Sequence, residues 1–317
     1  MAEEKSSALE AIADSISGLP APVETSFFKA VSHLIGSATA IPAAWLKRPA
    51  QAINDVTAAR STVSAVLAKG VAESALNDPA IMQLAMEIYL PSAVRKARNR
   101  VQIAQKAAEY TVDQVGKTNS SEAAPPDDDW MNKFMRLADD ASSEQLQNLF
   151  ARILAGEVMR NGSFSLSTLR TVSELDKSTA EDFSLVWSKS VGGAVDYNEE
   201  FARGEWFSRW KRMAEAGLMA QTKINQFLPP YRPVYNGDAL WSPMSAGTTL
   251  LRVHFSQECN ASWQCIEFTR IGRELGSILE EPDYPANIRI AARKLSGKVG
   301  IKRIEMITRG LQIEVIA

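Results

Sequence analysis

The chain has 317 residues, of which 45% are hydrophobic and 23% are charged, and its formal net charge is −2. This composition is typical of a folded soluble protein, and the length leaves room for two or three domains. A net charge near zero excludes a globally basic protein, so any basic surface for nucleic acid or an anionic membrane has to be local.

Two further counts limit the compartment and the chemistry. The two cysteines, Cys259 and Cys265, are too few for a disulfide framework, and the N-terminus lacks the basic and apolar regions of a signal peptide. We therefore expect a cytoplasmic protein. The only histidines are His33 and His254, so a histidine-based triad would have to use one of them and a two-histidine metal site would need both.

The sequence also lacks common catalytic motifs. The sequence has no GxSxG, HExxH or GxGxxG motif, and its cysteines lack CxxC spacing. Val115 to Thr118 ends like a phosphate loop, but Thr111 stands where the leading glycine would be. The sequence thus predicts a non-enzymatic protein with no catalytic residue, no cofactor and no metal.

The N-terminal region reads as a short amphipathic helix followed by an apolar segment. Residues 6–17 have apolar side chains at helical spacing, and Pro20 and Pro22 end this helix. No charged residue occurs from Ala30 to Leu46, but this run is shorter than a usual membrane span and a proline interrupts it. Its apolar residues share one face, which is typical of a helix that lies against a surface.

Three interpretations of Phe27 to Leu46 stay open. The pattern favours a core helix of a bundle, and the others are an element at a membrane surface and a true membrane span. In the second case the protein would lie peripherally at the inner face of a membrane. The candidate membrane or partner face then consists of Phe27, Phe28, Ile35, Ile41 and Trp45.

A long helix is expected next. Asp78-Pro79 is a helix start, and Pro91 is expected to kink or break the helix before Ser92 restarts it. The alternatives for its basic first turns are a solvated surface paired with acidic residues, or a site for phosphate, acidic lipid or nucleic acid. The candidate anion-binding residues are Arg95, Lys96, Arg98 and Arg100.

Composition divides the chain near residue 119. Gly, Ser, Pro and three aspartates make residues 119–129 an acidic linker between an N-terminal helical domain, residues 1–118, and a second domain, residues 130–317. The second domain opens with three predicted helices, which begin at Trp130, after a Ser142 cap and after a Ser165 cap.

The predicted secondary structure changes from helices to strands after Gly217. Before it, Ser178 caps one helix, residues 192–200 form a loop, and a further helix ends at Gly217. Residues 248–255 and 262–268 are rich in β-branched and aromatic side chains, which predicts two strands joined by a polar turn. Residues 301–307 and 311–316 predict a terminal hairpin. The predicted strands are thereby confined to the last third of the chain.

The predicted fold class is mainly α, with an N-terminal helical bundle, a central helical domain and a C-terminal α+β module with short antiparallel strands. In that module a helix, two strands and a further helix follow in the order of a winged helix, which residues 165–279 resemble. Many such modules bind DNA and others bind only protein. Here acidic residues offset the basic ones on the helix that would enter a groove.

A more specific resemblance lies in Ala151 to Glu157, ARILAGE, followed by Gly162 to Ser165 and by Thr168-Leu169. Together with Trp130 and Phe134, these residues resemble an uncharacterised bacterial family, the domain of unknown function twenty-eight-oh-six. The resemblance implies a bacterial origin and a helical fold and carries over no catalytic residue. The chain is also similar, in general character, to helical abortive-infection proteins of anti-phage defence.

Two functional hypotheses follow. The first is a non-enzymatic interaction or effector protein in bacterial anti-phage defence, with a protein partner or a second copy of the chain, and with an anionic membrane surface as a further partner. The second is a winged-helix DNA-binding regulator, although the balanced charge disfavours nucleic acid as a partner. An enzyme ranks third.

Overall fold

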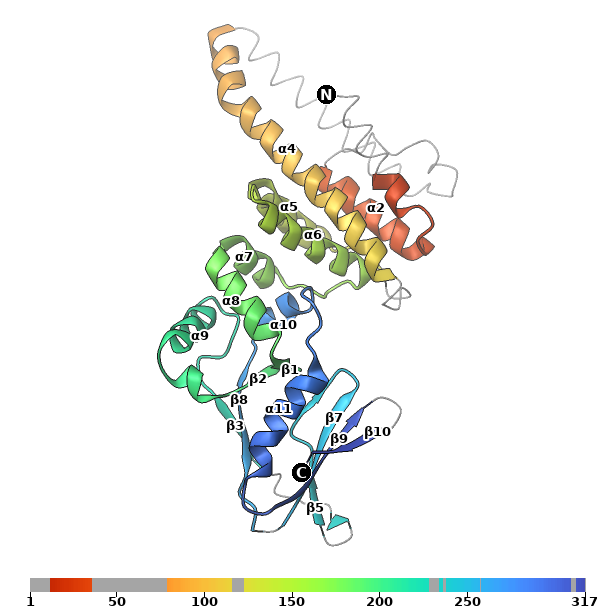
Figure 1. Cartoon of the computed structure of the whole chain (residues 1–317). Helices are drawn as coiled ribbons and strands as arrows, with labels where there is room; N and C mark the ends of the chain where they lie inside the picture. The colour runs from red at the N-terminus through yellow and green to blue at the C-terminus, as the bar shows by residue number, and fades with distance from the viewer. Residues whose placement is uncertain are drawn as a thin grey trace. The chain divides into compact units, whose positions relative to one another are not determined.

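The structure is a computed structural model that describes residues 12–35, 79–115, 123–227, 234–235, 238–256, 258–308 and 312–316. The chain divides into two compact units, Met1–Ser173 and Glu174–Ala317. The first unit is helical, and the second combines helices with two antiparallel sheets (Figure 1). The prediction of a mainly helical chain with antiparallel strands toward the C-terminus is therefore confirmed.

The first unit is built around one long helix, α4 (Pro79–Val115). It packs against α2 (Ala21–Ile35), α5 (Asp128–Asp140) and α6 (Glu144–Met159), and α7 (Leu166–Glu174) follows. Because α4 contacts α5 and α6 directly, the segment predicted as a linker joins parts of one unit, and the units divide after Ser173 instead. Large side chains in this unit are fully buried, among them Phe27, Leu34, Ile103, Phe134, Phe150 and Ile153.

Helix starts follow capping chemistry, although two caps are not the predicted residues. The cap of α6 is Ser143, whose hydroxyl accepts a hydrogen bond from the Leu146 N–H at 3.2 Å, so the predicted Ser142 cap is wrong by one residue. The cap of α8 (Lys177–Trp187) is Asp176 rather than Ser178. A carboxylate at this position also interacts favourably with the helix dipole.

Pro91 lies inside α4 and does not end it, so the predicted break is wrong. A proline in a helix removes one backbone hydrogen bond. The helix runs from residue 79 to residue 115 and so continues for 24 residues beyond Pro91. In addition, α4 packs against three other helices of the unit. Such packing supplies most of the stability of a helix in a folded protein and outweighs the local loss.

The ARILAGE motif holds the loop after α6 through a buried carboxylate. Glu157 is 1% exposed, and its two carboxylate oxygens accept hydrogen bonds from the backbone N–H groups of Gly162 at 2.7 Å and Phe164 at 2.9 Å. A Cβ on Gly156 would lie 2.7 Å from the Phe164 ring, so glycine is needed there. The Trp130 indole N–H donates to the Phe164 carbonyl at 2.8 Å. The motif therefore ties α5 and α6 to the start of α7.

Replacing Glu157 with Gln should lower the free energy of unfolding by about 1–3 kcal/mol. The reason is that the carboxamide replaces one acceptor with an NH₂ group that faces a backbone N–H in a buried site. Denaturant unfolding followed by circular dichroism measures the change. Glu144→Gln, at the exposed start of the same helix, is the matched control and should change stability by no more than about 0.5 kcal/mol. Equal effects of the two substitutions would contradict this account of the motif.

Two antiparallel sheets organise the second unit. The four-stranded sheet has the order β1-β2-β8-β3, and the six-stranded sheet has the order β10-β9-β7-β5-β4, with β6 also paired to β7. The strands of the first are β1 (Ser190–Val191), β2 (Ala194–Asp196), β3 (Ile224–Phe227) and β8 (Ser262–Glu267). Those of the second are β4 (Val234–Tyr235), β5 (Asp238–Trp241), β6 (Ser245–Ala246), β7 (Thr249–Phe255), β9 (Ile301–Thr308) and β10 (Gln312–Val315).

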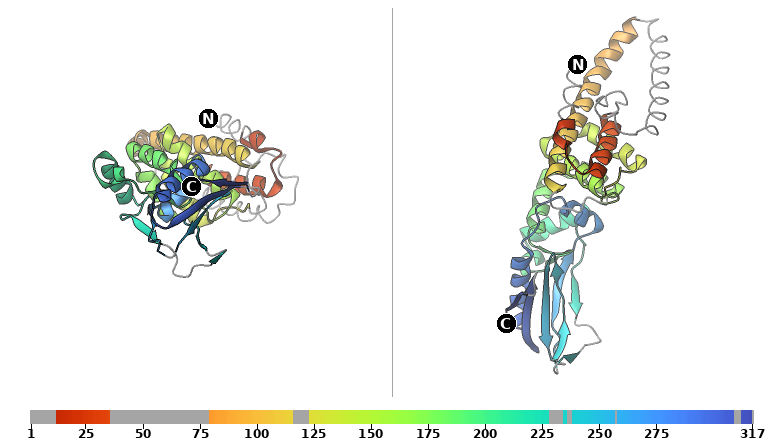
Figure 2. Two further views of the ribbon diagram at one scale, coloured as in Figure 1. Left: turned by 60° about the horizontal axis from the view of Figure 1, so that its bottom comes forward. Right: turned by 90° about the vertical axis from the view of Figure 1, so that its right-hand side faces the viewer.

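The helices of this unit are α8, the 3₁₀ helix η2 (Glu199–Ala202), α9 (Glu205–Glu215), α10 (Arg270–Gly276) and α11 (Tyr284–Ser296). Of these, α11 packs against β7, β9 and β1 (Figure 2). One core joins α11 to both sheets. It includes Leu251 and Val253 of β7, Ile304 and Met306 of β9, Trp263 and Cys265 of β8, and Ile288 and Leu295 of α11.

The sequence-based predictions about strands have different outcomes. The terminal hairpin is confirmed as β9 and β10. The strands predicted at 248–255 and 262–268 exist as β7 and β8, but they belong to different sheets, so the prediction that they form one hairpin is wrong. The predicted loop at 192–200 is also wrong, because it contains β2, which pairs with β1. Since β1 and β2 lie before residue 200, the prediction that strands are confined to the last third of the chain is wrong as well. Short strands of two or three residues are too brief to show an alternating pattern.

Candidate functional site

Strand alternation gives β7 and β9 two different faces. Leu251, Val253, Ile304 and Met306 point into the core, so the residues between them lie on the opposite face of the sheet. The register pairs Leu250 with Ile307, Arg252 with Glu305 and His254 with Arg303, and it pairs Ile313 and Val315 of β10 with Ile307 and Glu305. We call this set the outer face: Leu250, Arg252, His254, Arg303, Glu305, Ile307, Ile313 and Val315.

The centre of the outer face is a carboxylate surrounded by cationic side chains. Glu305 is 6% exposed. Its Oε2 lies 3.1 Å from His254 Nε2 and 3.0 Å from Arg252 Nε, and the latter contact is ionic without hydrogen-bond geometry. Its Oε1 lies 2.8 Å from Arg303 Nη2. Two arginines therefore share one carboxylate, which leaves the centre of this face with an excess of positive charge.

This environment changes the acidity of Glu305. Burial raises the pKa of its carboxyl group, but the hydrogen bond with His254 and the charges of Arg252 and Arg303 together lower it further, so the pKa is below the ordinary value of 4.5. A carboxylate with a lowered pKa stabilises the folded state above its unfolded pKa, and the contribution is lost as pH falls through the folded pKa. The Glu305 cluster therefore stabilises the sheet at neutral pH.

Stability should fall as the pH drops from about 4.5 toward and through the lowered pKa of Glu305, because the carboxylate is then protonated and its ionic contacts are lost. Urea unfolding at a series of pH values measures this slope. In Glu305→Gln the slope should be smaller, because this titration is removed. Glu258→Gln, at an exposed loop position, is the control and should keep the wild-type slope. An unchanged slope in Glu305→Gln would contradict the lowered pKa.

Exposed apolar side chains lie beside this cluster. Leu250 is 36% exposed, Ile313 is 52% exposed and Val315 is 55% exposed. Ile313 and Val315 both lie on β10, the strand at one end of the order described for the six-stranded sheet. Singly exposed apolar residues are common on protein surfaces, whereas apolar residues gathered on one face mark interaction sites.

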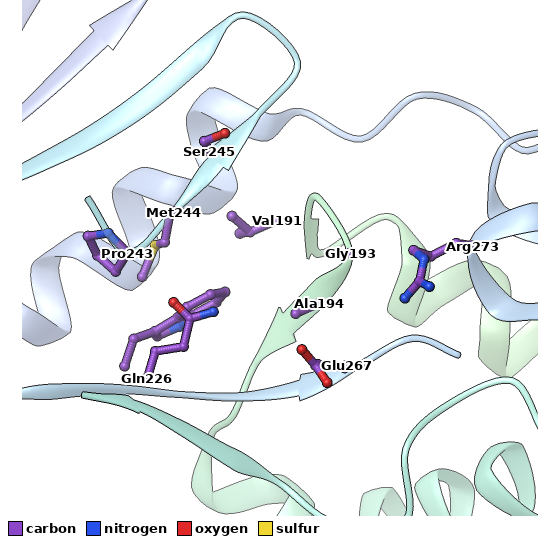
Figure 3. A pocket seen from close by; sticks show the side chains of 10 residues that line it. Val191, Gly193, Ala194, Gln226, Pro243, Met244, Ser245, Glu267 and Arg273 are labelled. Atoms are coloured by element: carbon purple, nitrogen blue, oxygen red, sulfur yellow. The ribbon is translucent and has the colours of Figure 1, made fainter. Parts of the chain in front are cut away.

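A small pocket lies elsewhere in the second unit (Figure 3). Its volume is about 230 Å³, and it is formed by the β1–β2 hairpin, β3, the approach to β6, β8 and α10. Apolar side chains lie at one end, and Glu267 and Arg273 lie at the other (Figure 3). The apolar lining includes Val191, Ala194, Pro243, Met244 and Trp263.

Two further features of this unit bear on its chemistry, the buried Cys265 thiol and the grouping of side chains that could bind a metal. Burial raises the pKa of the Cys265 thiol to about 12, with smaller contributions from Glu267 and Asp196, so the thiol stays protonated at neutral pH. Within the ranges that the structure describes, no group of three or more His, Cys, Asp or Glu side chains could hold a metal ion.

The predicted anion-binding residues separate into two pairs. Arg100 donates to Asp139 of α5 with Nε at 2.5 Å and Nη2 at 2.8 Å, and Lys96 Nζ lies 3.9 Å from the same carboxylate. Lys96 and Arg100 therefore fit the first alternative, in which the basic residues of this helix pair with acidic residues. Arg95 and Arg98 are exposed, so an anion site at this helix would depend on them alone.

The structure describes only part of the predicted membrane or partner face. Phe27 is fully buried in the first unit, as a core helix requires, while Phe28 and Ile35 are partly exposed. Ile41 and Trp45 lie outside the described residues. Of the helices that the structure describes, none has the length and apolar character to cross a membrane.

The outer face was not identified from sequence as a site. His254 was singled out only as one of two histidines, and its partner Glu305 lies 51 residues further along the chain. The one local signal is alternation: Arg252 and His254 alternate with apolar residues in β7, and Glu305 lies between Ile304 and Met306 in β9. Which strands pair, and in which register, cannot be read from that signal.

Residues 92–228 match the model of a family described as "Protein of unknown function (DUF2806)", which confirms the resemblance seen in the ARILAGE region. The match includes the second part of α4, α5 to α9 and β1 to β3, and it ends before β7 and β9. Neither the curated proteins nor the solved structures gave a match to this chain.

Proposed function

We propose that the chain is a non-enzymatic interaction protein that binds a partner protein through the outer face of its six-stranded sheet. The observation that supports this is the grouping of Leu250, Ile313 and Val315, all at least 36% exposed, around the Glu305 cluster. Hydration of the apolar side chains on such an exposed sheet face costs free energy in the free protein. Covering the face with another apolar surface removes that cost.

The charges of the outer face indicate the chemistry of the partner. Arg252 and Arg303 both use the single carboxylate of Glu305, so one further anionic group can be accommodated beside them. Arginine is enriched at protein interfaces because its planar group pairs with carboxylates and packs on apolar surface. The partner surface that fits best is therefore apolar with an acidic side chain near its centre.

A photo-reactive amino acid at Leu250 or Ile313 should cross-link the full-length protein to one discrete partner in cells, because both positions lie on the proposed interface. Mass spectrometry identifies the product. The matched control is position Lys302, which is exposed on the opposite side of β9. Adding Val315→Asp should abolish the Ile313 cross-link, since a buried unpaired charge at the interface is costly.

The same experiment distinguishes the partners. A product made of two copies of the chain would identify the partner as a second protomer, and a different protein would identify a heterologous partner. Cross-linking at Lys302 as strong as at Ile313, or a broad mixture at every position, would contradict the proposed interface.

A winged-helix DNA-binding regulator is the second candidate, and the topology of the four-stranded sheet supports it. The elements α8, β2, η2, α9, β3 and β8 follow one another, and β8 lies between β2 and β3. A winged helix has the same succession, with its last strand in the middle of the sheet. In this reading α9 would enter the major groove. The strands β4 to β7 would take the place of the wing.

The charges on α9 limit this candidate. Arg209 and Arg212 of α9 both pair with Asp182 of α8. Lys211 of α9, and Arg203 just before this helix, have no carboxylate partner among the described residues. If α9 binds DNA, each of Arg203→Ala and Lys211→Ala should reduce the slope of log Kd against log salt by about 1. Fluorescence anisotropy with duplex DNA measures it, with Lys298→Ala as the control. No duplex binding at about 50 mM salt would exclude this candidate.

A further inference from the structure

The six-stranded sheet ends at β10, and no described strand pairs with the far edge of β10 (Figure 1). An edge strand leaves backbone N–H and C=O groups available to another strand, and proteins usually protect such an edge with lysine, proline or a bulge. The four residues of β10 include neither lysine nor proline, and their register with β9 is regular. Within the described chain, the edge of β10 is therefore open to a further strand.

The hydrogen bonds with β9 show which peptide groups face this edge. The Ile316 N–H donates to the Ile304 carbonyl at 2.9 Å, and these two residues stand opposite each other when the β9–β10 register is continued. In an antiparallel pair of strands, hydrogen-bonded positions alternate with positions that form no hydrogen bond to that neighbour. Ile313 and Val315 are therefore not bonded to β9, and their N–H and C=O groups point to the open edge.

The same two residues carry the apolar side chains of the strand. Ile313 is 52% exposed and Val315 is 55% exposed. Glu314 between them lies on the opposite face, where its carboxylate accepts hydrogen bonds from Nε of Arg289 at 2.9 Å and from Nη2 at 2.8 Å. The edge thus offers apolar side chains on one face, a neutralised carboxylate on the other and available peptide groups between them.

An antiparallel strand of the same sequence fits this edge. When Glu314 lies on a twofold axis, Ile313 of each copy stands opposite Val315 of the other, and every outward N–H and C=O group of these two residues finds a partner. The apolar side chains then form cross-strand pairs, which stabilise a sheet. The two Glu314 carboxylates would repel each other as a direct pair, but Arg289 of each copy neutralises its own.

We propose that two copies of this chain associate by antiparallel pairing of their β10 strands. The contact is the edge of the sheet, so the proposal goes beyond the proposed function: it joins the outer faces of two copies into one continuous surface. Each copy contributes one short strand, so the buried area is below that of a standard interface and the expected Kd is on the order of 10–100 μM.

Disulfide trapping tests the register. In Glu314→Cys the two thiols lie at a non-hydrogen-bonded pair, where Cα atoms are about 4.5 Å apart and a disulfide can form. At about 100 μM, the oxidised full-length variant should therefore run as a covalent dimer on a non-reducing gel. The matched control is Gln312→Cys on the same strand, because the two copies of this position would be about 14 Å apart, too far for a disulfide.

A proline at position 315 tests the backbone contact. Val315→Pro removes an outward N–H group and takes no hydrogen bond from the pairing with β9. Added to Glu314→Cys, it should lower the dimer yield by about tenfold or more, whereas Val315→Thr keeps the N–H and should stay within about twofold. Thermal unfolding checks that each variant is folded. The unmodified protein, whose Cys259 and Cys265 are buried, should give no covalent dimer.

Three results would overturn the proposal: no covalent dimer of Glu314→Cys, equal trapping of Gln312→Cys, or an unchanged dimer yield when Val315→Pro is added and the protein is folded. The cross-link from Leu250 reports on the proposed function separately. A Leu250 product without a Glu314→Cys dimer overturns the strand pairing and supports the outer face as a binding surface. A Glu314→Cys dimer without a Leu250 product supports the strand pairing and contradicts the proposed function.

Discussion

The pairing of β7 with β9 is the constraint on which the second unit depends. Because side chains alternate along both strands, one register places Leu251, Val253 and Ile304 in the core and leaves Arg252 and Glu305 outside. A shift of one residue would bury the two charges and expose the core. The contacts of Glu305 with Arg252, Arg303 and His254 oppose such a shift, so the same cluster that forms the candidate site also fixes the register of the sheet.

The first unit uses its polar groups in a different way. Glu157 accepts from two backbone N–H groups, and Asp139 holds Arg100 through two contacts, so each carboxylate connects elements of the helical unit. In the ARILAGE segment, Glu157 therefore holds the loop after α6 in place. In the second unit, contacts within the chain leave part of the charge and apolar surface of the outer face uncovered, and this face is therefore the candidate site.

The sequence predicted local features well and long-range pairing poorly. The helices from Trp130 onward and the terminal hairpin follow from apolar spacing within a few residues, and both are present. Strand partners far apart in the chain were missed, because nothing in residues 248–268 shows that β8 pairs with β2 and β3 rather than with β7. The Glu305 cluster was missed for the same reason, since its parts lie about 50 residues apart.

Covalent footprinting of the outer face, compared between purified protein and protein in intact cells, tests the central claim most directly. Hydroxyl radicals should label Leu250, Ile313 and Val315 in the purified protein, and these side chains should be protected in cells because a partner covers them. Val299 and Ile290, which are 78% and 57% exposed away from this face, should be labelled equally in both samples. Equal labelling of the outer face in both samples would contradict the claim that it binds a partner.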